Sequence, residues 1–367
     1  MKYLISGGGT GGHIYPALAI AREIERRDQE AKILYVGTKT GLEAKLVPRE
    51  GLDFTTIRVE GMPRRLNLDS LRAAKELIYG LIESNKIIKN FNPDIVIGTG
   101  GYVCGPVVFQ ATRRGIPTLI HEQNAFPGVT NKILSRYVDK VAITFKESVE
   151  YFKHPEKTIL TGNPIRDELF QINRELAYKE LKVDPKTPLI LSFGGSGGQK
   201  ALNDAILGII KNNLIYNDFQ LIHITGHRLY DDFVEQIEKL NIKLGDNIKI
   251  LPYLYEMPAA LNIADLIISS AGAITLAEIS AVGIPSILIP KGYTAENHQE
   301  YNARAFEEAG ASLVILEKDL EERRLGEKIN KLLFDQDLLN RMAVKSKKIG
   351  KINAAEEIYE IISQLIS

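Results

Sequence analysis

Cysteine and long uninterrupted apolar sequence are both scarce in this chain, and each scarcity excludes a class of protein. Cys104 is the single cysteine among 367 residues, so a fold held by intramolecular disulfides is excluded and a reducing compartment is expected. The longest mostly apolar stretch, residues 266–290, is interrupted by Pro285, glycines and Glu278. It therefore predicts strand, loop and helix, not a membrane span. Residues 2–6 look like a strand, so no signal peptide is expected, and the chain is predicted to be soluble and cytoplasmic.

The formal net charge is zero, but basic and acidic residues are unevenly distributed along the chain. Residues 1–162 carry 23 Lys and Arg against 17 Asp and Glu, a balance of +6, and the remainder has the opposite balance of −6. A hydrophobic content of 44% and a charged content of 25% are typical of a globular protein. The basic first half predicts an anionic partner, either a phosphate or a lipid surface. No nucleic-acid partner is expected.

Short apolar runs alternate with longer helical stretches throughout the chain. Such runs, bounded by glycine and separated by helices, predict an α/β fold with doubly wound parallel sheets. The predicted strands cover residues 2–6, 32–36, 54–59, 94–98, 117–121, 138–144, 158–161, 189–193, 219–225, 248–252, 265–270, 285–290 and 312–316.

This pattern starts twice. LISGGGTGGH at residues 4–13 and LSFGGSGGQK at residues 191–200 each run from a strand through a glycine loop into a helix. The segment TGNPIRDEL at residues 161–169 interrupts the periodicity between them. We therefore predict two Rossmann-like domains, 1–162 and 163–347, that face each other across a central cleft. Residues 338–367 are predicted to be helical, with the helix at about 348–367 packing back on the first domain.

Both glycine loops are candidate anion sites, because they place backbone N–H groups and a helix start after a buried strand. Residues 7–12 satisfy the G-x-G-x-x-G spacing of dinucleotide-binding loops. The second strand, however, ends in Gly37-Thr38-Lys39 without the acid that binds ribose, which disfavours NAD and leaves NADP open. His13 closes the loop, and two roles are open for it. It can hydrogen-bond the loop, or it can act as a general base that the helix N-terminus keeps neutral.

Seven motifs occur in an order that resembles one family. These are GGTGGH (8–13), GTGGYVCGP (98–106), HEQN (121–124), GNPIR (162–166), GGSGGQ (194–199), GAITLAE (272–278) and HQEYNA (298–303). Together they resemble the MurG family of glycosyltransferases over almost the whole chain. The resemblance implies a GT-B fold, in which the first domain binds lipid I and the second binds UDP-N-acetylglucosamine. It also implies an inverting transfer that forms lipid II for peptidoglycan synthesis. A UDP-sugar epimerase and a non-catalytic UDP-sugar-binding subunit are the alternatives.

The resemblance and the chemistry of an inverting displacement together suggest roles for individual residues. The reaction needs a base for the acceptor hydroxyl and a partner for the leaving diphosphate. His13 is the first candidate base and Glu122 the second. No histidine and cysteine cluster has the spacing of metal ligands, so neither a metal site nor a cofactor is expected. The predicted donor-binding residues are Thr10, Gly11, Gly12 and Asn124 for the sugar, Arg166 and Ser196 for the diphosphate, Leu254, Ala273, Ile274, Thr275, Leu276, Ala277 and Glu278 for the uridine, and Gln299 for hydroxyls or phosphate.

Each of these assignments competes with a structural interpretation. Arg166 could instead form an interdomain salt bridge, Glu278 could be a solvated helix residue, and Gln299 could be a surface polar group. In HEQN, alternation puts His121 and Gln123 on one face of the strand and Glu122 and Asn124 on the other. One of those two pairs is therefore expected to be structural. Cys104 is interpreted as a small buried hydrophobe and not as a nucleophile.

Residues 61–90 combine basic and apolar side chains. Such a stretch is either an amphipathic core helix after a basic loop or a peripheral patch on an anionic membrane. Its apolar residues are too many for a single core-facing stripe, which favours the second interpretation. A peripheral location on the cytoplasmic face of the bacterial inner membrane follows, with cell-wall synthesis proteins as possible partners. The predicted membrane patch consists of Arg64, Arg65, Leu68, Arg72, Lys75, Leu77, Ile78, Leu81 and Ile82.

Overall fold

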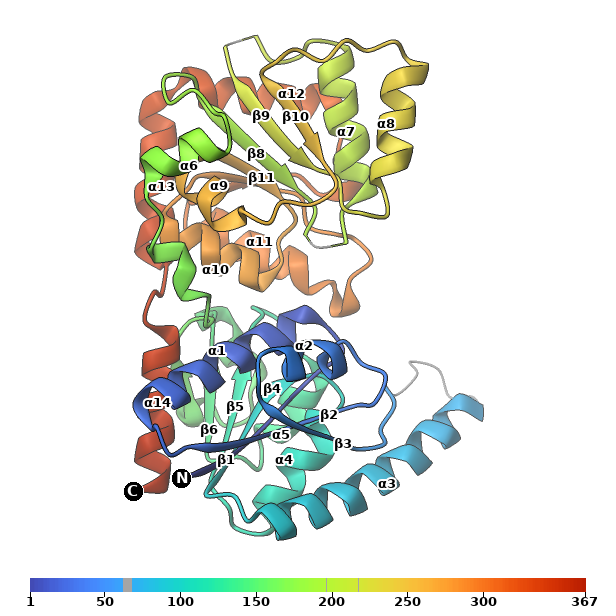
Figure 1. Cartoon of the computed structure of the whole chain (residues 1–367), viewed down its shortest axis with the longest axis vertical. Helices are drawn as coiled ribbons and strands as arrows, with labels where there is room; N and C mark the ends of the chain where they lie inside the picture. Colours follow the sequence, from blue (N-terminus) through green and yellow to red (C-terminus); the bar gives the residue numbers. More distant parts are fainter. Residues whose placement is uncertain (62–67, 196, 217) are drawn as a thin grey trace. The chain divides into compact units, whose positions relative to one another are not determined.

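Two parallel sheets form the framework of the chain (Figure 1). The computed structural model describes residues 1–61, 68–195, 197–216 and 218–367. Every strand pair in both sheets is parallel, which confirms the predicted α/β class. The chain divides into two compact units: unit 1 comprises Met1–Ile165 and Ile352–Ser367, and unit 2 comprises Arg166–Lys351. Within the described ranges, no helix has both the length and the apolar character needed to cross a membrane.

Unit 1 contains a sheet of seven strands in the order β3-β2-β1-β4-β5-β6-β7. The chain runs outward in one direction from β1 to β3 and then in the other from β4 to β7. The switch point between β1 and β4 is where ligands bind in folds of this kind. The strands are β1 Lys2–Gly7, β2 Lys32–Gly37, β3 Asp53–Thr56, β4 Ile95–Gly100, β5 Thr118–Glu122, β6 Lys140–Ile143 and β7 Thr158–Leu160. The helices are α1 Gly11–Arg27, α2 Glu43–Arg49, α3 Leu68–Phe91, α4 Cys104–Arg113, α5 Val129–Leu134 and α14 Ala354–Ile366, with short 3-10 turns at Lys146–Tyr151 and Pro155–Lys157.

Successive residues of the central strands feed two different cores, because side chains alternate across a sheet. On β1, Tyr3 and Ile5 pack with α1 and with Ile358 of α14. Leu4 packs on the other face, where Val107 of α4 lies. The C-terminal helix α14, red in Figure 1, thus returns to the first strand of the chain and lies beside α1. Full burial of each such aliphatic side chain stabilises the fold by about 1.5–3 kcal/mol.

Unit 2 repeats this arrangement with six strands in the order β10-β9-β8-β11-β12-β13. Its switch point lies between β8 and β11. The strands are β8 Leu189–Phe193, β9 Gln220–Ile224, β10 Ile248–Leu251, β11 Leu266–Ser269, β12 Ser286–Leu288 and β13 Ser312–Val314. The helices are α6 Arg174–Glu180, α7 Lys200–Lys211, α8 Tyr230–Lys239, α9 Met257–Ile263, α10 Ala273–Val282, α11 His298–Glu308, α12 Glu322–Phe334 and α13 Gln336–Ile349, with 3-10 turns at Asp167–Phe170, Ala295–Asn297 and Glu317–Asp319.

The helical segment predicted at residues 338–367 is two helices, because the chain breaks at Gly350. A Cβ atom at Gly350 would lie 2.4 Å from the carbonyl oxygen of Ser280 on α10. Only glycine permits this close approach of two backbones. The break allows α13 to end in unit 2 and α14 to begin in unit 1.

His223 on β9 is fully buried in the core of unit 2. Its Nδ1 lies 3.1 Å from the hydroxyl of Ser192, and its Nε2 has no hydrogen-bond partner among the described residues. Burial lowers the pKa of His223 to about 3, because the charged imidazolium is poorly solvated in the core.

We predict that His223→Gln flattens the pH dependence of stability. Between about pH 3 and pH 6.5 the unfolded imidazole binds a proton that the folded imidazole does not. The free energy of unfolding therefore falls with falling pH, by about 1.4 kcal/mol per unit for this histidine. Urea denaturation across pH 4 to 8 measures the free energy of unfolding of both proteins. Below pH 6, the difference in this free energy between wild type and variant should shrink by that amount for each pH unit. Above pH 7 the difference should stay constant. A difference that is constant over the whole range would contradict the prediction.

Candidate functional site

In unit 1 the loops after β1 and β4 interlock at the switch point. The N–H of Gly8 donates to the carbonyl oxygen of Gly100 at 3.3 Å. Gly101 has a φ of +82°, and a Cβ atom there would lie 2.2 Å from the carbonyl oxygen of Gly8. The two loops can approach this closely only because glycine occupies these positions. Cys104 stabilises this contact, because its buried thiol donates to the carbonyl oxygen of Ser6, at the end of β1, at 2.7 Å.

His13 is the third residue of α1, and its ring folds back on the glycine loop. Its Nδ1 lies 2.9 Å from the carbonyl oxygen of Gly8. A carbonyl oxygen only accepts hydrogen bonds, so Nδ1 carries a proton in this contact. A Cβ atom at Gly100 would lie 2.8 Å from Cδ2 of His13, so glycine is required there as well. The ring thus contacts the loop, which is the first of the two roles that the sequence left open; the role of general base stays a prediction.

His121 and Gln123 form a buried chain of hydrogen bonds at the end of β5. The His121 Nε2–H donates to the carbonyl oxygen of Gly162 at 2.9 Å, and Nδ1 accepts from Nε2 of Gln123 at 2.9 Å. The same amide nitrogen donates to the carbonyl oxygen of Thr99 at 2.7 Å. Burial lowers the pKa of His121 to about 4, although its hydrogen bond to the backbone of Gly162 opposes the shift. His121 is therefore neutral near pH 7, and this pair ties the end of β5 to the end of β4 and to the loop after β7.

Glu122 and Asn124, on the other side of the strand, are also bonded to each other. One carboxylate oxygen of Glu122 accepts from the backbone N–H and the side-chain amide of Asn124, at 3.0 and 3.2 Å. The other accepts from the N–H of Gly128 at 3.1 Å and the Asn131 amide at 2.8 Å. With 2% of its surface exposed, Glu122 organises residues 124–131 around its two oxygens. This geometry favours His13, which is partly exposed, as the base. The base role of either residue stays a prediction.

Glu43 is a site residue that sequence reasoning missed. Its carboxylate is fully buried, and one oxygen accepts from the N–H of Gly9 at 3.1 Å. The other accepts from the N–H and the hydroxyl of Thr38, at 3.0 and 2.7 Å. The second strand has no acid at its end, and Glu43 follows Gly37 by six residues, at the start of α2. There it holds the loops after β1 and β2 together. Because α2 folds back over β2, strand spacing alone could not reveal this contact.

In unit 2 the glycine loop after β8 packs closely against the loop after β9, which borders β8 on the side away from the switch point. Gly195 and Gly198, after β8, have φ angles of +77° and +71°. A Cβ atom at Gly198 would lie 2.1 Å from the carbonyl oxygen of Thr225, after β9. Ser196, predicted to contact the diphosphate, lies outside the described residues.

The start of α10 leaves backbone donors available. Its N-cap residue is Gly272, no side chain caps it, and its first turn contains no acid. Such a helix start attracts an anion, because its first N–H groups have no partner within the helix. Of the residues predicted to bind uridine, Ala273 and Leu276 are buried and Ile274, Thr275 and Ala277 are partly exposed. Leu254 is buried between the exposed Tyr253 and Tyr255 in the loop after β10.

Arg166 and Glu278, assigned to different parts of the donor, contact each other within unit 2. Nε of Arg166 lies 3.0 Å from a carboxylate oxygen of Glu278. The Glu278 side chain is only 9% exposed, so it is not a solvated helix residue. Burial raises the pKa of Glu278, and the ion pair with Arg166 opposes that shift.

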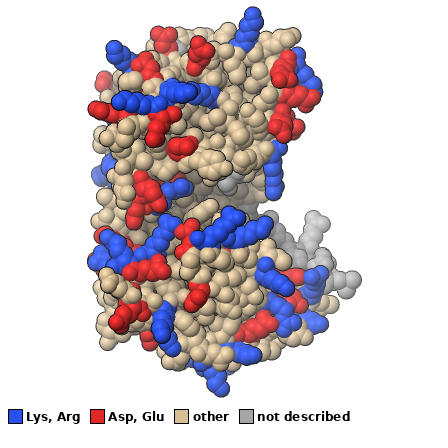
Figure 2. All heavy atoms as spheres, viewed as in Figure 1, with Lys and Arg blue, Asp and Glu red and all other residues tan. Residues whose placement is uncertain are grey.

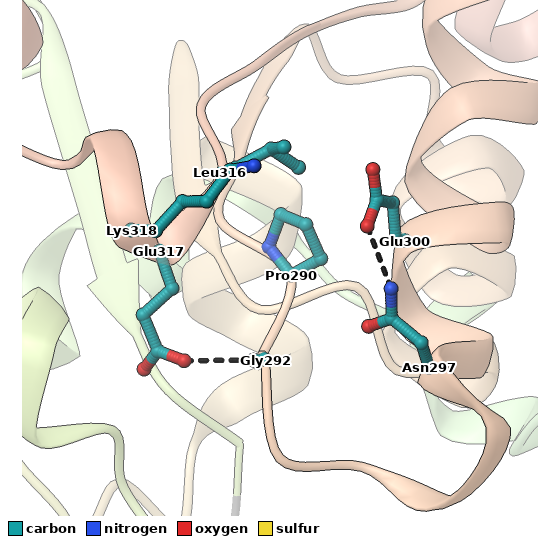
Figure 3. A pocket seen from close by; sticks show the side chains of 7 residues that line it. All are labelled: Pro290, Gly292, Asn297, Glu300, Leu316, Glu317 and Lys318. Carbon is teal, nitrogen blue, oxygen red and sulfur yellow. Dashed lines mark hydrogen bonds between the residues drawn. The ribbon is translucent and has the colours of Figure 1, made fainter.

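Gln299, the last predicted donor-binding residue, is the second residue of α11 and contacts the loop between β12 and that helix. The Gln299 side-chain oxygen accepts from the N–H of Lys291 at 3.1 Å, and the residue is 8% exposed. A cavity of about 520 Å³ opens beside this loop (Figure 3). In it, Glu317 accepts from the N–H of Gly292 at 2.7 Å. The cavity is lined by Pro290, Gly292, Asn297, Glu300, Leu316, Glu317 and Lys318.

Metal-ligand geometry is not found in the part of the chain that the structure describes: no three histidine, cysteine or acidic side chains there are grouped to hold an ion. Two carboxylates that are spaced as possible metal ligands, Asp335 and Asp337, lie at the start of α13. There Asp335 caps the helix, because it accepts from the N–H of Leu338 at 2.8 Å. The expectation of no cofactor stays a prediction.

Comparisons with known proteins agree with this arrangement. Residues 3–143 match the glycosyltransferase family 28 N-terminal domain, and residues 189–364 match the C-terminal domain of that family. Two relatives, from Acetivibrio thermocellus and Thermoanaerobacter sp. strain X514, are each 52% identical and align with the whole of this chain, covering 98% and 100% of their own lengths. Both are named UDP-N-acetylglucosamine–N-acetylmuramyl-(pentapeptide) pyrophosphoryl-undecaprenol N-acetylglucosamine transferase.

Solved structures give the same picture of the fold. The crystal structure of Acinetobacter baumannii MurG has a TM-score of 0.79 at 28% identity and covers 99% of this chain and 100% of its own. A UDP-GlcNAc 2-epimerase from Neisseria meningitidis has a TM-score of 0.71 at 16% identity, with 99% and 100% coverage, and is similar in fold alone. The two parallel sheets with their paired glycine loops, taken with these matches, define a glycosyltransferase. The chain belongs to glycosyltransferase family 28.

We predict that Glu43→Gln destabilises unit 1. An amide in place of the carboxylate points an N–H₂ group at the N–H of Gly9 or at Thr38, which leaves buried donors unpaired. The expected cost is about 1–3 kcal/mol, measured by urea denaturation at pH 7. Glu25→Gln is the matched control, because Glu25 is exposed on the neighbouring α1. Equal stability of the two variants would rule out a role for Glu43 in holding the loops.

Proposed function

We propose that this protein transfers N-acetylglucosamine from UDP-N-acetylglucosamine to the 4-hydroxyl of the muramyl sugar of lipid I, forming lipid II. The observation that carries the proposal is the set of relatives about half identical over the full chain, whose names specify this transfer. The seven motifs of the family lie at the carboxyl ends of strands or at the starts of the helices that follow.

The proposed reaction is a single displacement with inversion at carbon 1 of the sugar. The acceptor oxygen attacks carbon 1 as the bond from that carbon to the diphosphate oxygen breaks, and UDP leaves with the bonding electrons. His13 takes the acceptor proton on Nε2, the nitrogen that carries the lone pair when Nδ1 donates to Gly8. Thr10, Gly11 and Gly12, which precede His13 at the surface of unit 1, contact the sugar together with Asn124.

Unit 2 is proposed to bind the UDP portion of the donor. The N-terminal N–H groups of α10 receive negative charge or the uracil carbonyls. Glu278 holds the ribose hydroxyls with the oxygen that Arg166 leaves available, and the charge of Arg166 opposes the rise in pKa that burial causes in that carboxylate. Gln299 positions the sugar, because its side-chain oxygen is already fixed by Lys291.

The membrane patch is proposed to be an exposed stripe on α3. Ala73, Gly80 and Ser84 are buried, so one face of the helix packs inward. On another face Leu71, Ile78 and Ile82 are 70%, 58% and 61% exposed. Leu77 and Leu81 are partly buried and Lys75 is exposed. The residues 71, 75, 78 and 82 follow helical spacing, which supports an apolar stripe with a basic residue.

The charge around this stripe is more balanced than the sequence suggested. Arg72 pairs with Glu60 at 2.8 Å and Arg58 with Glu83 at 2.7 Å. Figure 2 accordingly shows basic and acidic side chains side by side in the region of α3. We therefore assign most of the membrane affinity to the isoleucine and leucine side chains. Arg64 and Arg65 lie outside the described residues, and the side chain of Leu68 is not described. The proposal places the protein peripherally on the cytoplasmic face of the bacterial inner membrane, beside other cell-wall synthesis proteins.

Transfer of labelled N-acetylglucosamine from its UDP donor to a lipid I analogue tests the proposed function, and His13→Gln tests the base. We expect wild-type protein to form the disaccharide product, and His13→Gln to lower kcat by about 10²–10⁴-fold with unchanged affinity for UDP. Glu122→Gln serves as the comparison, because its loss is expected to reduce stability more than kcat. A wild-type protein that binds UDP but transfers no sugar would contradict the assignment as an enzyme. An unchanged kcat for His13→Gln would exclude His13 as the base.

Replacing two isoleucines on α3 tests the membrane stripe. We expect the variant Ile78→Asp with Ile82→Asp to lose at least about tenfold in binding to vesicles of equal parts phosphatidylglycerol and phosphatidylcholine, because two apolar contacts are removed. Co-sedimentation measures the bound fraction. Val344→Asp is the matched control, since Val344 is 69% exposed on α13 of unit 2. Equal binding by the two variants would show that α3 does not contact the bilayer.

A further inference from the structure

Lys291 follows β12 and reaches across the carboxyl edge of the unit 2 sheet. Its Nζ donates to the carbonyl oxygen of Gly198, in the glycine loop after β8, at 2.8 Å. In the strand order, β11 lies between β8 and β12. The side chain of Lys291 therefore spans the end of β11, next to the switch point between β8 and β11. In folds of this kind, ligands bind at this edge of the sheet, where the glycine loop and the start of α10 also lie.

Both ends of this crossing are held in place by other hydrogen bonds. Gln199, at the end of the glycine loop, donates to the carbonyl oxygen of Ile289 at 3.3 Å and to Glu317 at 3.2 Å. Glu317 accepts the N–H of Gly292 at 2.7 Å, and the N–H of Lys291 itself donates to Gln299. Gln199 is fully buried, whereas the side chain of Lys291 is partly exposed. The ammonium group is thus held between two hydrogen-bonded backbone segments, and the side chain that carries it reaches the surface.

Among the described residues, the ammonium group of Lys291 makes fewer hydrogen bonds than it has N–H donors. It carries three N–H groups, and the bond to Gly198 takes one of them. Burial lowers the pKa of Lys291, and the charge of Glu317 acts in the opposite direction. A partly buried cation is stabilised by a nearby anion. An anionic ligand at the glycine loop would supply that partner.

Arg166, the other cation predicted to meet the diphosphate, is already paired with the carboxylate of Glu278. Part of its charge is therefore compensated within the protein, and a second cation is needed to balance the departing diphosphate. Lys291 already donates a hydrogen bond to the glycine loop. It can therefore act as this second cation without a rearrangement of the sheet.

We infer that Lys291 binds the diphosphate of UDP and stabilises the charge that gathers on it as the bond to the sugar breaks. This assignment rests on the proposed function, because it requires a UDP donor in unit 2. Lys291 then supplies in this chain the positive charge that a divalent cation supplies in other diphosphate sites.

Lys291→Met tests the assignment, with UDP and uridine titrated separately by calorimetry. Removing a charge-assisted contact to the diphosphate should weaken UDP binding by about 10- to 100-fold and leave uridine binding unchanged. Lys291→Arg should keep most of the affinity for UDP. Steady-state transfer should show a lower kcat for Lys291→Met.

Lys249→Met is the matched control for a purely structural lysine. Lys249 is also partly buried, also has a pKa lowered by burial, and donates to the carbonyl oxygens of Leu181 and Lys182. We expect its loss to reduce stability without changing the ratio of UDP to uridine affinity. If Lys291→Met lowers both affinities equally, or lowers neither, the inference is overturned. If wild-type protein binds no UDP, the proposed function itself fails.

Discussion

The close approach of glycine loops at the carboxyl ends of parallel strands is the constraint on which the candidate site of each unit depends. In unit 1 a Cβ atom at Gly101 would overlap the backbone of Gly8, and in unit 2 a Cβ atom at Gly198 would overlap the backbone after β9. The helices α1 and α7 begin within a few residues of these loops, after β1 and β8.

Buried polar side chains hold these loops in place. Glu43 joins the loops after β1 and β2, and His121 and Gln123 join the ends of β5, β4 and β7. In unit 2, Gln199, Lys291 and Glu317 connect the glycine loop to the segment after β12. Each of these groups is costly to bury unless it is paired. We interpret them as the reason that irregular, glycine-rich backbone keeps one conformation at the site.

Much of the fold could be predicted from the sequence, because parallel strands buried on both faces leave a strong apolar signal. Each of the thirteen predicted strands overlaps an observed one, although several end earlier than predicted, β3, β12 and β13 by two residues or more. The break at Gly350 could not be predicted, since it depends on contact with Ser280 some seventy positions away. Motifs identified the glycine loops and His13, but Glu43 and Lys291 act through contacts that no local spacing encodes. The pairing of Arg166 with Glu278 likewise joins residues 112 positions apart.

The central claim is that the two sets of loops perform an inverting sugar transfer. The most direct measurement is the NMR spectrum of the product formed from UDP-N-acetylglucosamine labelled with ¹³C at carbon 1, in the presence of a lipid I analogue. Single displacement predicts a β-(1→4) linkage between the two sugars. An α linkage would contradict the displacement, and a 2-epimer of the donor formed without acceptor would show that this fold performs a different reaction in this chain.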